Sequence, residues 1–138
     1  MKIDTVLIYI RHVIALLMGI SLVYVGIAHF LDPNWFEPIV PSIIGFPTFW
    51  VLLSGLCEVI LGCLLILPKS RRLAAIGLVF LLIVLYSANM NMWINNIELT
   101  GTQLSNIWHI VRALVQILLI LIALWLGGFI PLVRMQKK

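Results

Sequence analysis

The chain has 138 residues, of which 63% are hydrophobic and only 10% are charged. Soluble domains carry about 25% charged residues, so this composition cannot cover a water-facing surface and excludes a soluble protein. The net charge of +4 comes from basic residues near the ends of apolar runs and in one short connection. That distribution is typical of a membrane protein and excludes a nucleic-acid-binding surface.

Four apolar segments are each long enough to cross the bilayer as a helix, which takes about 20 residues. They are predicted at Leu7–Phe30, Thr48–Leu67, Leu73–Trp93 and Ile107–Val133. The connections between them are short, and none has the composition of a soluble domain. We therefore expect one all-α integral membrane domain over residues 1–138, built as a four-helix transmembrane bundle.

The first span could instead be a cleaved signal peptide, because Lys2 precedes its apolar run and Gly26-Ile27-Ala28 resembles a cleavage site. The run is longer than the core of a usual signal peptide, however, and it carries Tyr24 and His29. We therefore expect the span to be retained.

Basic residues predict the direction of each span. Residues 68–72, between the second and third spans, contain three Lys or Arg residues, and the tail after Val133 contains three more. The first and third connections contain none. Because Lys and Arg collect on the cytoplasmic side, both termini of this inner-membrane protein are predicted to be cytoplasmic.

The first connection, residues 31–47, contains four prolines, which exclude a regular spanning helix. It is also rich in Trp, Phe and Ile, which are costly to expose to water. It is therefore predicted to lie in the outer interface or to dip back as a lid over the bundle. Asp32, Trp35 and Pro41 are the candidate site residues of this lid.

Polar residues recur at helical spacing inside the spans. In the fourth span Ser105, His109, Arg112 and Gln116 follow i, i+4, i+7 and i+11, so they form one stripe. Ionisable residues at membrane depth are costly, so they face the bundle and mark function. Stripes on all four spans supply the candidate site residues His29, Glu58, Tyr86, Asn89, His109, Arg112 and Gln116.

An ion pair between Glu58 and Arg112 is predicted, because Arg112 stays protonated and Glu58 is the only carboxylate in a span. Tyr86, Asn89 and His109 are its expected hydrogen-bonding neighbours. Counting from the span ends places this cluster in the outer half of the membrane. Two interpretations stay open: a ligand-binding site, or a pair that only fixes helix register. No catalytic residue is assigned, and no metal site is predicted because Arg112 would repel a cation.

Short sequence stretches, which follow one another in a fixed order along nearly the whole chain, resemble those of a known family. They are Gly26-Ile27-Ala28-His29-Phe30, Ile39-Val40-Pro41, Ser54-Gly55-Leu56-Cys57-Glu58, Leu61-Gly62, Leu73-Ala74-Ala75-Ile76-Gly77-Leu78, Ser87-Ala88-Asn89 and the internal Arg112. With this order and spacing the chain resembles the DoxX family of small four-helix bacterial membrane proteins. The resemblance implies a four-helix bundle in the bacterial cytoplasmic (inner) membrane and an association with quinone-linked redox systems. It matches the family's membrane positions to His29, Glu58, Asn89 and Arg112. The chain has no C-x-x-C motif, so direct disulfide exchange is not implied.

Three functions remain in competition. The first is a membrane component of a redox system that binds a quinone or a similar amphiphile in the outer half of the bundle. The second is a transporter or permease for a small solute, and the third is a non-catalytic partner or assembly subunit. Quinone is the only cofactor considered. The expected partners are the lipid bilayer, redox partner proteins and a second copy of the chain.

Overall fold

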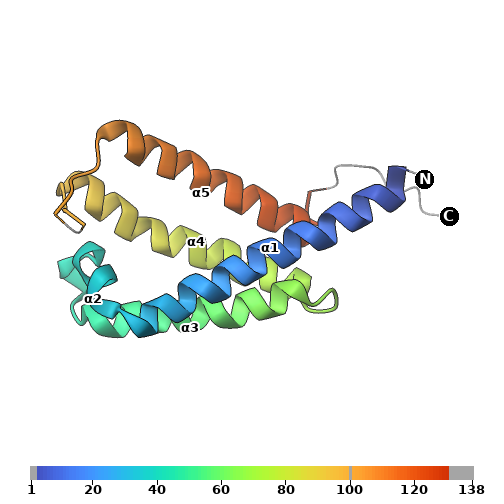
Figure 1. The fold of residues 1–138 in the computed structure, drawn as a ribbon, viewed down its shortest axis with the longest axis horizontal. Helices are drawn as coiled ribbons and strands as arrows, with labels where there is room; N and C mark the ends of the chain where they lie inside the picture. Colours follow the sequence, from blue (N-terminus) through green and yellow to red (C-terminus); the bar gives the residue numbers. More distant parts are fainter. Residues whose placement is uncertain (1–2, 100, 131–138) are drawn as a thin grey trace.

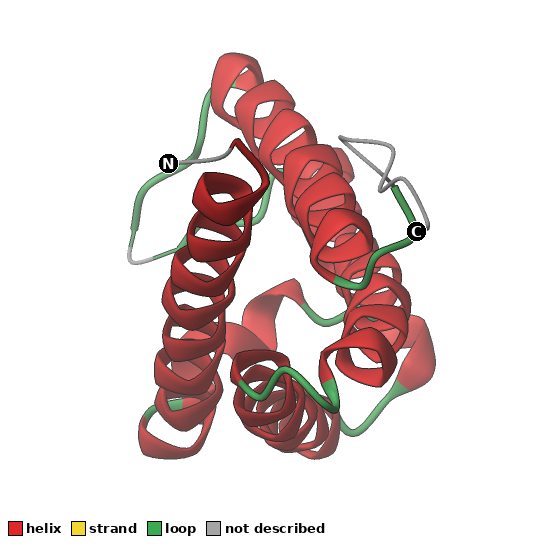
Figure 2. Cartoon of the chain, turned by 90° about the vertical axis from the view of Figure 1, so that its right-hand side faces the viewer, coloured by secondary structure: helices red, strands yellow, loops and turns green. Residues whose placement is uncertain are grey.

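The computed structural model describes residues 3–99 and 101–130, and its regular elements are all helices (Figures 1 and 2). Each of the four long helices is apolar and long enough to cross a membrane. The four predicted spans are therefore confirmed as helices, which suggests a multi-pass membrane protein. The long helices are α1 (Ile3–Leu31), α3 (Pro47–Ile66), α4 (Arg71–Ile94) and α5 (Asn106–Leu126).

The fourth span ends earlier than predicted. Val133 was its expected last residue, whereas α5 ends at Leu126. Gly127 caps the helix, and Gly128 follows it with a φ of 78°. This left-handed conformation is open to glycine and stops a helix, so the glycine pair outweighs the apolar residues that follow. Residues 131–138 lie outside the described part of the chain.

Three short helical turns fill the connection between α1 and α3. They are α2 (Pro33–Phe36), η1 (Glu37–Ile39) and η2 (Ser42–Ile44). As the prolines predicted, no long helix forms in this connecting segment, residues 32–46. It lies between the ends of α3 and α4 (Figure 1), in contact with both helices. The bundle thus has a connecting-segment end and, opposite, a turn end where residues 67–70 join α3 to α4.

Helices α1 and α3 pack side by side in opposite directions because glycines line their interface (Figure 1). Gly19 faces Gly62, and Gly26 faces Gly55. A Cβ atom on Gly26 would lie 2.6 Å from the carbonyl oxygen of Gly55, and one on Gly19 would lie 2.7 Å from that of Gly62. Glycine therefore sets the helix separation, as small residues do between membrane helices.

Gly26→Ala should lower the free energy of unfolding by about 1–3 kcal/mol, the usual cost of overpacking. The added methyl group meets a backbone oxygen, which cannot move unless the helices separate. Gly77→Ala is the matched control, because its methyl group meets only the flexible end of the Leu61 side chain. Denaturant titration in mild detergent measures both variants. Equal midpoints for Gly26→Ala and the wild type would contradict the close α1–α3 packing.

The core lies toward the turn end and is shared by all four long helices. Its buried members are Ala15, Leu65, Ala74, Leu78, Leu82, Ala123 and Leu126. Two arginines satisfy the last carbonyl groups of helices here. Arg11 donates from Nε and Nη2 to the carbonyl oxygen of Leu126, which ties α1 to α5. Arg71 donates to the carbonyl oxygens of Leu65 and Ile66 at 3.0 and 3.1 Å.

Candidate functional site

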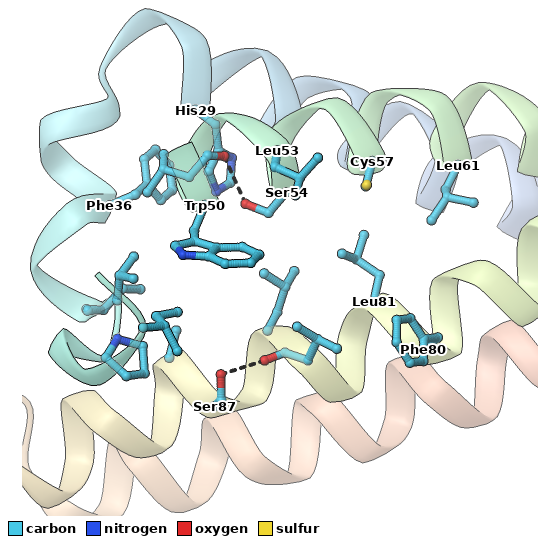
Figure 3. A pocket seen from close by; sticks show the side chains of 18 of the residues that line it. His29, Phe36, Trp50, Leu53, Ser54, Cys57, Leu61, Phe80, Leu81 and Ser87 are labelled. Atoms are coloured by element: carbon cyan, nitrogen blue, oxygen red, sulfur yellow. Dashed lines mark hydrogen bonds between the residues drawn. The ribbon is translucent and has the colours of Figure 1, made fainter. Parts of the chain in front are cut away.

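A cavity of about 520 Å³ lies between α3 and α4, toward the connecting-segment end (Figure 3). Its size falls within the range of small-molecule sites, about 300–1,000 Å³. Trp50, Ser54, Cys57 and Leu61 line it from α3 at i, i+4, i+7 and i+11, the spacing of one helix face. Residues of α4 line the opposite wall, among them Gly77, Phe80, Leu81, Val84 and Ser87.

The connecting segment closes one end of this cavity. Phe36, Ile39, Val40, Pro41 and Ile44 line that end. Three contacts hold the segment in place, one to each neighbouring helix. The Phe36 ring stacks on the His29 ring of α1, with centroids 3.9 Å apart.

The other two contacts are hydrogen bonds. Asn91 of α4 donates from Nδ2 to the carbonyl oxygen of Ile39 at 2.9 Å. Thr48 of α3 donates from Oγ1 to Oε1 of Glu37 at 2.5 Å. Because the segment is attached to α1, α3 and α4, it is a fixed wall of the cavity in this structure.

The cavity wall is almost entirely apolar. None of its lining residues is Asp, Glu, Lys or Arg. Its polar side chains include the hydroxyl groups of Ser54 and Ser87, which donate to the carbonyl oxygens of Val51 and Val84 at 2.9 and 2.7 Å (Figure 3). Since those hydrogens are used within their own helices, the hydroxyl oxygens face the cavity as acceptors.

His29 lines the cavity, and its ring lies next to the buried carboxyl group of Glu58. Its Nδ1 atom lies 2.9 Å from the carbonyl oxygen of Val25 and 3.2 Å from Oε2 of Glu58. A carbonyl oxygen can only accept, so the hydrogen-bond network assigns a hydrogen to Nδ1. The other ring nitrogen, Nε2, forms no hydrogen bond with the described residues and is the atom left for a ligand.

Glu58 is buried beside His29, with 6% of its surface exposed. Its Oε2 atom accepts no hydrogen bond from the described residues. The polar neighbour of this buried carboxyl group is the imidazole of His29, whose Nδ1 atom lies 3.2 Å from Oε2. Glu58 itself does not line the cavity, so it acts on the site only through His29.

The predicted Glu58–Arg112 ion pair is wrong. Within residues 3–99 and 101–130, the ion-pair contact of Glu58 is with His29, and Arg112 donates from Nη1 to Sδ of Met92 at 2.9 Å. The reason is the pairing of the helices. The face of α3 that carries Glu58 also carries Gly55 and Gly62 and docks on α1, whereas α5 packs on α4.

The other predicted residues of the spans gather between α4 and α5 or stand apart. The His109 ring stacks parallel to the Trp93 ring at 5.4 Å, and Gln116 donates to the carbonyl oxygen of Leu82. Tyr86 and Gln116 line a smaller cavity of about 200 Å³. Asn89 is half-buried and makes no side-chain hydrogen bond with the described residues. The structure thus separates the predicted cluster into two groups, His29 with Glu58 and the residues of α4 and α5.

Of the three candidate residues in the connecting segment, only Pro41 lines the cavity. Trp35 packs edge-on against Phe36, with centroids 4.7 Å apart. Asp32 is exposed, and its side chain does not cap α2. Within the described ranges, no three His, Cys, Asp or Glu side chains gather as a metal-binding group.

The prediction missed most of the residues that form the cavity. Trp50, Ser54 and Cys57 share one face of α3, and that spacing is visible in the sequence. A lipid-facing surface, however, has the same apolar composition as this cavity wall. Only Ser54 and Ser87 could have drawn attention to these faces, and serine is common inside membrane helices.

A family described as "Domain of unknown function (DUF8561)" matches the chain over residues 18–127. The match covers most of the chain, from the middle of α1 to the end of α5, so the chain belongs to this family. The comparisons with curated proteins and with solved structures found no match. The resemblance to the DoxX family is not tested by these findings and stays a prediction.

Proposed function

We propose that this member of the DUF8561 family is a membrane component of a redox system and binds a quinone-like amphiphile between α3 and α4. The observation that carries the proposal is the cavity of about 520 Å³, which has an apolar wall and few polar groups. Small-molecule sites share this design of a largely apolar cleft with a few placed polar groups. The redox role rests on the resemblance to the DoxX family.

The proposed topology places both termini in the cytoplasm of a bacterial cell. The turn at residues 67–70 and the start of α4 carry three basic residues, which favours the cytoplasmic side for the turn end. The connecting segment is then external, where it acts as a lid at the membrane interface. The cavity consequently lies in the outer half of the bilayer.

The charge of the cavity wall separates this proposal from transport of an ionic solute. A charged solute that crosses a membrane protein needs paired charges or polar backbone along its path. The cavity wall carries no acidic side chain, no Lys and no Arg. The wall therefore favours an uncharged ligand. A role as a partner or assembly subunit stays a separate prediction.

The proposal is tested with the purified full chain in lipid nanodiscs. Solvent extraction should recover a quinone bound in the preparation. A short-chain ubiquinone or menaquinone analogue should also raise the melting temperature, because a ligand that binds only the folded state stabilises it. An alkane matched in length to the analogue's tail is the control for unspecific partitioning. The proposal would be contradicted if extraction recovers no quinone and the analogue raises the melting temperature no more than the alkane does.

A further inference from the structure

The polar atoms of the cavity are not spread evenly along its length. His29, Trp50, Ser54 and Ser87 lie toward the connecting-segment end. The wall around Gly77 and the neighbouring residues of α3, nearer the turn end, is apolar. At a rise of about 1.5 Å per residue, Ser87 and Gly77 are separated by about 15 Å along α4. The cavity is therefore a slot with one polar end and one apolar end.

The polar end offers hydrogen bonds without charge. His29 Nε2 and the serine oxygens are open to a ligand, and the indole nitrogen of Trp50 forms no hydrogen bond with the described residues. An ionic head group placed here would lose its hydration and find no counter-charge on the cavity wall. The slot thus fits a molecule with one uncharged polar group and an apolar chain.

The opening of the slot faces the bilayer. Several lining residues are also exposed on the outer surface of the spans, including Phe80 at 71%, Ile60 at 49% and Val84 at 49%. These side chains form the rim between α3 and α4. The connecting segment, held by Phe36, Thr48 and Asn91, closes the end of the slot instead. A ligand dissolved in hydrocarbon can reach the slot sideways.

We infer that the cavity takes an uncharged amphiphile from the bilayer, through the side opening between α3 and α4, and holds it in one orientation. Its polar group lies near Trp50 and Ser54, and its apolar chain points toward Gly77. This inference rests on the proposed function for the occupation of the cavity. It adds the orientation of the ligand and its route of entry, and it makes the ligand's lack of charge testable.

Two photoreactive alkylphenols test the orientation in nanodiscs. One carries a diazirine beside the ring, and the other carries it at the end of the chain. The ring probe should label the peptide that contains Trp50 and Ser54, and the chain-end probe should label the peptide that contains Gly77 and Phe80. Reversed or identical labelling would overturn the inferred orientation while binding itself stands. Labelling that unlabelled alkylphenol does not compete away would instead defeat the proposed function.

Competition tests the charge of the ligand. Alkylphenol should reduce labelling at least about tenfold more effectively than a fatty acid carboxylate or an alkyl trimethylammonium ion of equal length, a preference of about 1.4 kcal/mol. Equal competition by either ion would overturn the inference that the ligand is uncharged.

Two matched valines test the route of entry. Val84→Trp narrows the rim and should slow labelling several-fold, whereas Val115→Trp, on the exposed face of α5 outside the cavity wall, should leave the rate unchanged. Asn91→Ala removes the hydrogen bond between α4 and the connecting segment and should not accelerate labelling. Faster labelling in Asn91→Ala would indicate entry past the connecting segment. That result, or an unchanged rate in Val84→Trp, would overturn the side route.

Discussion

His29→Phe should lower the free energy of unfolding by about 1–3 kcal/mol, the usual cost of leaving a buried polar group without its partner. Phenylalanine keeps a ring against Phe36 but leaves the Glu58 carboxyl group buried without the imidazole of His29 as its polar neighbour. Adding Glu58→Met should recover part of the loss, because the stranded carboxyl group is then removed. Unfolding of the single and double variants in mild detergent provides the double-mutant cycle.

A second cycle is the control for this result. Glu58→Met and Arg112→Met should be additive, since Arg112 contacts Met92 on α4 and lies apart from the α1–α3 interface that holds Glu58. Coupling of Glu58 to Arg112, with none to His29, would contradict the observed pairing and restore the pair expected from the sequence.

Cys57→Phe should abolish binding of the quinone analogue, which means at least about a tenfold loss of affinity. The Cys57 side chain lines the cavity, so a phenyl group there occupies the space of the ligand. The folded state should keep its stability, because the larger side chain enters an open cavity rather than a packed core. Binding is measured by the thermal shift, and stability by the midpoint without ligand.

Cys63→Phe is the matched control for this variant. Cys63 lies on the same helix, but it is exposed and does not line the cavity. The Cys63→Phe variant should therefore bind the quinone analogue with the affinity of the wild type. Retained binding in Cys57→Phe would place the ligand elsewhere, and equal loss in both variants would indicate a general effect of the added phenyl group.

The sequence by itself determined the class of protein and the positions of its helices. Apolar runs of about 20 residues have no stable alternative in hydrocarbon, because each backbone polar group must be satisfied within the segment. Prolines in residues 31–47 excluded a long helix across this connection, and residues 32–46 form only short helical turns. The end of α5 at Leu126 was missed because Gly128 stops a helix through its backbone conformation, while the residues after it remain apolar.

Helical spacing also identified His29 and Glu58 as buried polar residues, with 7% and 6% exposure. Spacing gives the face of a helix but not the neighbour that the face meets. Charge alone paired Glu58 with Arg112, whereas the glycine face of α3 docks on α1 and brings Glu58 to His29. Close backbone packing thus decided the partner, because it limits which faces can approach.

Only the tertiary structure decided where the cavity lies. Its wall consists of apolar side chains that would be equally suited to face lipid, so no pattern along the chain separates the two. The cavity exists because residues 32–46 lie between the ends of α3 and α4 and close one end of the space between these helices. The sequence determined the membrane helices through hydrophobicity, and the packing of those helices determined the space that they enclose.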